Sequence, residues 1–213
     1  MVYQALLDEI CDGSLPIGAH LVQDELAEQL GVSRQPVQQA IVRLKSEGLL
    51  EDAPGRGVRV PNLDLPKMQE HYQIRLLLDR LAARLSAQRA ADSKSFAEKM
   101  ASEGADIIAA GKKAVERHSV VDMIHHDVAF HGFIYECSGN SQIAPTVEIH
   151  WRFLRRVMGD VLRSAVEPES IWQQHQGILE AIVSGDVEQA EILASSHIEK
   201  ASDALITIFK AGS

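Results

Sequence analysis

The chain has 213 residues, of which 46% are hydrophobic and 24% are charged, and its formal net charge is −9. This ordinary globular composition excludes wholesale disorder, and no apolar run reaches the roughly 18 residues that a membrane helix needs. Because the two cysteines are far apart and the acidic N-terminus lacks a signal-peptide pattern, we expect a cytoplasmic protein without a disulfide framework or membrane association.

Three helices are predicted in the first part of the chain, at residues 2–11, 24–30 and 34–46. Ser33 is a suitable N-cap for the third helix. Two short strands, 49–51 and 58–60, then flank a turn rich in glycine. Helix, helix, turn, helix and hairpin is the order of a winged helix-turn-helix, and we assign this domain to residues 1–62.

Residues 63–66 are predicted to be a non-helical linker, because Pro61 and Pro66 bracket this stretch. Beyond it, glycine and proline become rare, and the helical period predicts about six helices. They lie near 67–89, 93–115, 120–138, 142–165, 168–184 and 187–210. Asp92, Ser119 and Asp186 are the expected N-caps. The predicted fold is mainly α, with residues 67–213 forming an all-α antiparallel bundle.

The third helix of the first domain has the composition of a DNA-recognition helix. Arginine can bridge guanine and glutamine can bridge adenine in the major groove, and the outward positions are Arg34, Gln35, Gln38 and Gln39. Residues 1–62 carry a net charge of −4, which argues against DNA. However, the helix itself carries only positive charges, and phosphate attraction acts over about 8 Å. The alternative is a protein-binding winged helix with a solvated glutamine face.

Three helices of the second domain each direct a histidine toward the bundle interior, and one of them adds an aspartate at i, i+4. These residues are Asp127, His131, His175 and His197. Burying them unpaired is costly, and one shared divalent cation would satisfy all four. The donor set suits Zn first, with Ni, Mn or Fe as further options. The alternative is that each is a core histidine bonded to a carbonyl or to Asp127. The other six histidines are expected to be solvated.

The first domain resembles the bacterial GntR family of repressors. The resemblance is carried by GSLPIG at 13–18, LVQDELAEQLGVSRQPV at 21–37 and RLKSEGLL at 43–50. Gln38 and Gln39 depart from the family's usual Arg-Glu pair, which suggests an altered operator preference. The resemblance implies DNA contacts by Ser33, Arg34, Gln35, Gly55 and Arg56, and Gln38 is a further contact that we predict from its outward position.

The second domain is similar to the FCD effector domain that follows the winged helix in the FadR subfamily. The matching residues include Asp127-x-x-Phe130-His131, Ser138-Gly139-Asn140 and the run around His175. In metal-binding members the ligands match Asp127, His131, His175 and His197. Effectors of this family are usually small carboxylates, so the resemblance implies a clamp by Arg75 and one arginine among Arg152, Arg155 and Arg156, of which we select Arg152.

Together these observations predict a homodimeric transcription regulator that responds to a small carboxylate. As a repressor, it would bind a palindromic operator in double-stranded DNA, because two-fold protein symmetry requires a two-fold site. A metal-dependent enzyme is a rival interpretation, although no separate general base or nucleophile has a recognisable spacing. A structural metal domain without an effector is the other rival.

Overall fold

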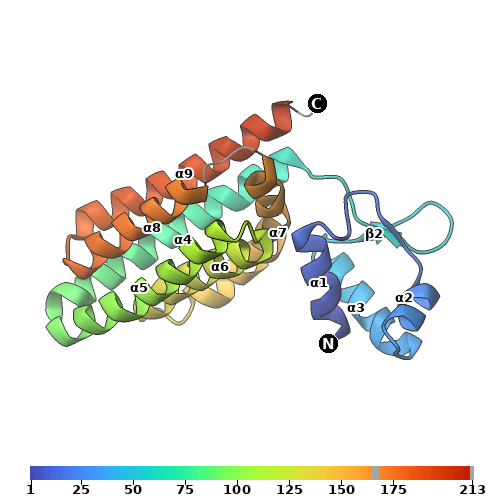
Figure 1. Ribbon diagram of the computed structural model, residues 1–213, viewed down its shortest axis with the longest axis horizontal. Coiled ribbons are helices and arrows are strands. Elements are labelled where there is room, and N and C mark those ends of the chain that lie inside the picture. The colour runs from blue at the N-terminus through green and yellow to red at the C-terminus, as the bar shows by residue number, and fades with distance from the viewer. Residues whose placement is uncertain (165–167, 212–213) are drawn as a thin grey trace. The chain divides into compact units, whose positions relative to one another are not determined.

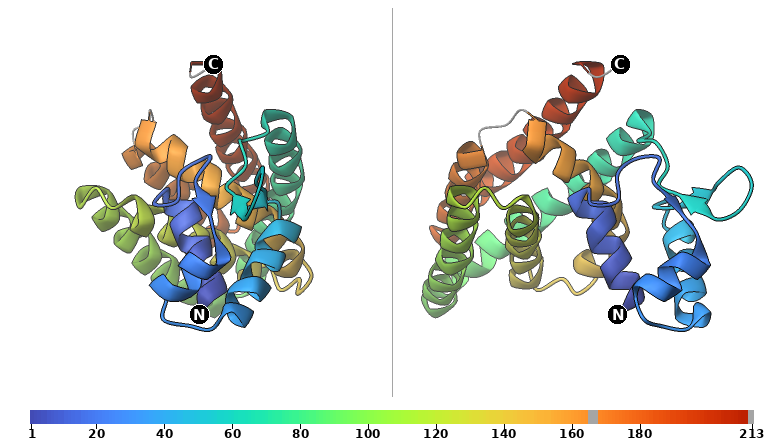
Figure 2. Two further views of the ribbon diagram at one scale, coloured as in Figure 1. Left: turned by 90° about the vertical axis from the view of Figure 1, so that its right-hand side faces the viewer. Right: turned by 45° about the vertical axis from the view of Figure 1, so that its right-hand side comes forward.

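The computed structural model describes residues 1–164 and 168–211, which are mainly helical (Figures 1 and 2). Contacts divide the chain into two compact units. The first consists of Met1–Asp64 with Arg152–Asp160, and the second of Leu65–Trp151 with the described residues from Val161 onward. Within the described part of the chain, no helix is long and apolar enough to cross a membrane.

The residues of the first unit up to Asp64 form helices and a small antiparallel sheet. The elements are α1 (Val2–Asp12), β1 (His20–Leu21), α2 (Gln23–Gln29), α3 (Arg34–Ser46), β2 (Glu51–Asp52) and β3 (Val58–Arg59). The strand order is β1-β3-β2, and His20 and Glu51 both lie opposite Arg59. The loop between β2 and β3 extends away from the helices of this unit (Figures 1 and 2).

Two glycines are required by the backbone of this unit. Gly31, in the turn between α2 and α3, has a φ of 64°, a left-handed conformation that favours glycine. Gly57 has a φ of 99°, and a Cβ there would lie 2.4 Å from the carbonyl oxygen of Leu21. The core beneath the sheet and helices contains Leu6, Ile10, Leu26, Val37, Leu44, Leu49 and Val60.

The strands differ from the prediction. The expected strands at 49–51 and 58–60 are only two residues long, at Glu51–Asp52 and Val58–Arg59. The additional strand β1 is also two residues long, which is too short for the alternation that predicts strands from sequence. The helix-turn-helix and the hairpin together form a winged helix.

The second unit contains a helical bundle. Its helices are α4 (Leu65–Asp92), α5 (Lys94–Glu116), α6 (Val120–Cys137), α7 (Ile143–Ser164), α8 (Pro168–Val183) and α9 (Val187–Ala211), with residues 152–160 of α7 grouped with the first unit. α4 contacts α5, α6, α8 and α9, and it runs beside α9 (Figure 1). Large buried side chains fill the interior, among them Met100, Ile108, Phe130, Trp172 and Ile182.

Two predicted boundaries of the bundle are wrong. Helix α4 begins at Leu65, so residues 65–66 of the expected linker are helical. Pro66 is tolerated in the first turn of a helix, because a backbone N–H at that position would have no partner within the helix. Asp92 ends α4, and Ser93 caps α5 by accepting a hydrogen bond from the backbone N–H of Phe96. The helix predicted near 142–165 corresponds to α7, and its expected last residue, 165, lies outside the described residues.

Candidate metal centre and DNA-binding surface

Four predicted ligands converge inside the second unit. Asp127 and His131 come from α6, His175 from α8 and His197 from α9, and all four are buried. One ligand atom from each lies within 4.8 Å of the other three. The Nε2 atoms of His175 and His197 are 3.3 Å apart, and Nε2 of His175 is 3.4 Å from Oδ1 of Asp127. One carboxylate and three imidazoles therefore face a common point.

Residues outside this group orient two of the imidazoles. Nδ1 of His131 lies 2.6 Å from Oδ1 of Asp79, and Nδ1 of His197 lies 3.1 Å from the amide oxygen of Gln174. Because these oxygens accept hydrogen bonds, both Nδ1 atoms carry a proton, which in a neutral imidazole leaves Nε2 as a bare lone pair. Metal-bound histidines are oriented in this way by carboxylates and carbonyls.

Two atoms that face the common point lack hydrogen-bond partners among the described residues. They are Oδ2 of Asp127 and Nε2 of His131, which lie 3.9 Å apart. Buried polar atoms are almost always hydrogen-bonded, and leaving one unpaired costs about 1–3 kcal/mol. The four side chains therefore fit a metal ion, because an ion would accept the lone pairs that no protein group satisfies.

Burial sets the protonation of the cluster. It lowers the pKa of His175 and of His197 well below the ordinary value, and the neighbouring imidazoles lower both further. Burial also raises the pKa of Asp127, against the opposing effect of His131 and Arg75. Both histidines are thus neutral at physiological pH, which is the form that binds metals.

Asp79 is a further residue of this cluster, to which the sequence reasoning gave no role. Besides His131, its carboxylate accepts a hydrogen bond from the hydroxyl of Tyr135 at 2.9 Å and lies 3.5 Å from Nε of Arg75. Burial alone would raise the pKa of Asp79, but the electrostatic effects of His131 and Arg75 and the hydrogen bonds from His131 and Tyr135 hold it below its usual value. The available signal was the i, i+4 spacing of Arg75 and Asp79 on one helix face. Gln174 was also missed, and no signal in the sequence distinguishes it from its neighbours.

Arg75 is buried beside this network, with only 2% of its surface exposed. Its guanidinium carbon lies 3.8 Å from the ring centroid of Trp151, and its Nε and Nη2 have no hydrogen-bond partner among the described residues. A cavity of about 10 Å³ borders His131 and His197, which is room for about one water molecule. The side chain of Arg152, the other predicted effector residue, lies outside what the structure describes.

The predicted DNA-binding residues form an exposed surface on the first unit. Ser33, Arg34, Gln35 and Gln38 are exposed at the start of α3, and Gly55 and Arg56 are exposed in the β2–β3 loop. Asp24, at the start of α2, pairs with Nε of Arg34 at 2.8 Å and also with the guanidinium of Arg56. One carboxylate thus joins α3 to the β2–β3 loop, a contact that the sequence did not reveal.

His71 and His150, which the sequence predicts to be solvated, instead form a partly buried pair. Their Nδ1 atoms are 2.8 Å apart, and their rings meet edge to face. The prediction was wrong because both residues belong to helices, α4 and α7, that approach each other in the tertiary structure.

Comparison with protein families agrees with this architecture. Residues 1–60 match the family model described as bacterial regulatory proteins, gntR family, and residues 70–200 match the FCD domain. A winged helix followed by a helical domain of this kind defines a bacterial transcription regulator. The chain belongs to the GntR family and carries a C-terminal FCD domain, so its family is one of regulators and not of enzymes.

Two relatives are described as transcriptional repressors. The HTH-type transcriptional repressor RspR of Escherichia coli K12 is 24% identical over 204 residues, covering 96% of this chain and 87% of that protein. The probable D-xylose utilization operon transcriptional repressor of Paenarthrobacter nicotinovorans is 28% identical over 193 residues, covering 89% of this chain and 80% of that protein.

Solved structures share the fold. Escherichia coli McbR/YncC has a TM-score of 0.81 at 23% identity, covering 98% of this chain and 96% of that one. A putative GntR regulator from Rhodococcus sp. RHA1 has a TM-score of 0.79 at 21% identity, covering 97% of this chain and 96% of that one. The mainly α fold, a winged helix-turn-helix followed by a helical FCD domain, is confirmed.

Proposed function

We propose that this regulator binds a divalent transition metal through Asp127, His131, His175 and His197, and that a small carboxylate at this centre controls its affinity for DNA. The observation that carries the proposal is the convergence of four buried ligand atoms within 4.8 Å of one another. Zn is the first choice for this donor set, with Ni, Mn and Fe as alternatives.

The contacts of the histidines favour a metal over the alternative of three satisfied core histidines. Asp79 and Gln174 occupy the Nδ1 atoms of His131 and His197, so the Nε2 atoms of these two rings need another partner. A proton on Nε2 of His175 could bridge to His197, but Nε2 of His131 would still lack a hydrogen bond. A shared cation would satisfy the three Nε2 atoms, while Nδ1 of His175 has no partner among the described residues.

Arg75 supports a carboxylate as the effector. Its Nη2 and Nε make no hydrogen bond to a described residue, although Nε lies 3.5 Å from the carboxylate of Asp79, and arginine binds carboxylates through paired N–H groups. Because the cavity at the centre holds about one water molecule, an organic acid requires a side chain to move. Trp151 is the side chain that covers the guanidinium, so we expect the acid to displace it. Arg152 remains a predicted second contact.

DNA recognition is proposed to use the start of α3 and the β2–β3 loop. Arg34, Gln35 and Gln38 would meet base edges, while Ser33, Gly55 and Arg56 would meet the backbone. We also propose a homodimer on a palindromic operator. Ile74 and Leu77, which are 43% and 61% exposed one turn apart on α4, supply an apolar surface that a second copy can cover.

The test combines metal analysis with DNA selection. The purified protein is expected to hold about one ion per chain, and His175→Ala is expected to lose both the ion and thermal stability. Glu70→Gln, an exposed change on α4, is the matched control. Full metal occupancy in folded His175→Ala would refute the ligand assignment.

Duplexes selected from random fragments by the protein are then titrated with and without a panel of small carboxylic acids. We expect one acid to shift the DNA affinity and to change the fluorescence of Trp151, and Arg75→Gln to remove both effects. If no acid alters DNA affinity, the metal centre is structural and the effector proposal fails. Arg34→Ala should weaken operator binding without loss of metal, and unchanged binding would rule out α3 as the recognition helix.

A further inference from the structure

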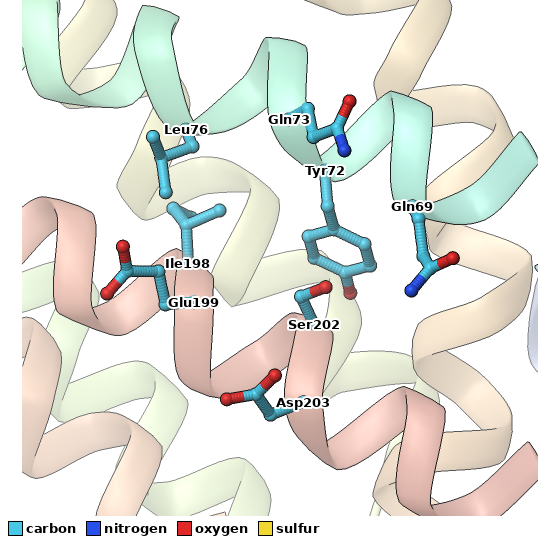
Figure 3. A pocket seen from close by; sticks show the side chains of 8 residues that line it. All are labelled: Gln69, Tyr72, Gln73, Leu76, Ile198, Glu199, Ser202 and Asp203. Carbon is cyan, nitrogen blue, oxygen red and sulfur yellow. The ribbon is translucent and has the colours of Figure 1, made fainter. Parts of the chain in front are cut away.

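A second pocket lies in the helical unit, between α4 and α9 (Figure 3). Its volume is about 300 Å³, which is at the lower end of small-molecule sites. The floor is apolar and is formed by the ring of Tyr72 with Leu76 and Ile198. Its lining contains none of the four proposed metal ligands, although Tyr72 also interacts electrostatically with Asp127 and Arg75.

The hydroxyl of Tyr72 lacks a partner in this pocket. Tyr72 is 3% exposed, and no hydrogen bond joins its hydroxyl to any described residue. Figure 3 shows the hydroxyl beside Ser202, directed toward α9. Burial raises the pKa of Tyr72 to about 12, so the group stays protonated at neutral pH. The rest of the side chain is buried, so a ligand bound in the pocket would supply a hydrogen bond that no described residue makes to this hydroxyl.

The walls of the pocket are chemically unequal. Glu199 and Asp203 stand one turn apart on α9, and Gln69 and Gln73 stand one turn apart on α4 (Figure 3). The two carboxylates repel each other at this i, i+4 spacing, and neither forms an ion pair with a lysine or arginine in the described part of the chain. The pocket therefore has negative charge on one wall and neutral amides on the other.

We propose that this pocket binds a small organic cation, an alkyl amine. Its ammonium group would lie between Glu199 and Asp203, its carbon chain over Leu76 and Ile198, and a polar atom at the hydroxyl of Tyr72. A bare metal ion fits this pocket less well than an alkyl amine, because the apolar floor beside the two carboxylates suits a carbon chain and offers no ligand to a metal. The ligand is opposite in charge to the carboxylate proposed for the metal centre, so the two sites take different molecules.

The probe for the test is 1,4-diaminobutane, titrated calorimetrically into the full-length protein. Neutral 1,4-butanediol and anionic succinate have the same carbon chain and serve as controls. We expect the diamine to bind with a Kd between about 10 µM and 1 mM, and both controls to bind at least about ten-fold more weakly. The titration is run on metal-loaded and on chelator-treated protein, without DNA, so its result is independent of the metal proposal. Absence of diamine binding, or equal binding of the diol, would overturn the assignment.

Variants then test the residues. Glu199→Gln and Asp203→Asn should each weaken diamine binding about ten-fold, because each removes one charge-assisted contact. Tyr72→Phe keeps the ring and should weaken binding by a smaller factor. Glu188→Gln removes an exposed charge elsewhere on α9 and should leave the Kd unchanged. If the folded charge variants bind as tightly as the parent, or if Glu188→Gln weakens binding equally, the amine is not held by these carboxylates.

Discussion

Nδ1 of His131 and Oδ1 of Asp79 lie 2.6 Å apart, although 52 positions separate the two residues in the chain. The contact joins α6 to α4, and Asp79 in turn meets Tyr135 and Arg75. This carboxylate therefore determines which nitrogen of His131 is available to a metal. It also connects the proposed ligands to the proposed effector arginine.

Asp79→Asn should weaken metal binding while the fold is retained. The amide has the shape of the carboxylate but no charge, so it orients the ring less firmly and makes the imidazole less basic. Loss of such a partner raises a metal Kd by about ten- to a hundred-fold. Competition with a coloured chelator measures the Kd, and Glu70→Gln on the exposed face of α4 should leave it unchanged. Unaltered affinity in the folded variant would show that Asp79 does not act through His131.

Asp24→Asn should strengthen DNA binding. Asp24 pairs with Arg34 and Arg56, the two arginines proposed to meet DNA, and its own charge repels phosphate. Exposed ion pairs are worth about 0.2–1 kcal/mol, so we expect about a two- to five-fold lower Kd at constant salt. Fluorescence anisotropy with a selected operator measures the change. The neighbouring variant Glu25→Gln removes the same charge without an arginine partner, and an equal gain there would mean that net charge alone is responsible.

Gly111→Ala should destabilise the bundle. A Cβ at this position would lie 2.0 Å from the ring of Trp172, which is buried and cannot move without repacking. Overpacking of this kind lowers the free energy of unfolding by about 1–3 kcal/mol. For a chain of this size, each kcal/mol lowers the Tm by about 2–4 °C. Gly132→Ala is the matched helical control, because nothing lies within 4 Å of its Cβ. It should stabilise the protein by about 0.5–1 kcal/mol, and a similar Tm for both variants would contradict the packing argument.

His71→Gln should reduce the loss of stability at mildly acidic pH. Burial, followed by the charges of His150 and Lys67, lowers the pKa of His71 from 6.5 to about 4. Between these pH values the unfolded chain binds a proton that the folded chain does not, so stability falls as the pH is lowered from 7 to 5. Thermal melts across this range should show a smaller decrease in Tm for His71→Gln than for the parent. His118→Asn, at an exposed position after α5, should retain the parental decrease.

Local patterns predict the proposed ligands well and their partners poorly. The i, i+4 spacing of Asp127 and His131 places them on one face of α6, and the apolar periods around His175 and His197 direct those rings inward. These side-chain directions follow from the helical repeat, which can be read from the spacing of residues in the sequence. By contrast, the contact of Gln174 with His197 depends on how α8 packs against α9, and no local period contains that information.

The sequence by itself determined the class of this protein: a winged helix, a helical bundle and a set of inward histidines, because each follows from residue types at helical spacing. The tertiary structure alone decided which side chains meet across helices. The contact of Asp24 with two arginines, the link from Asp79 to His131 and the pocket over Tyr72 all depend on how separate elements pack. That packing is set by interlocking side chains far apart in the chain, whose pairing no single segment specifies.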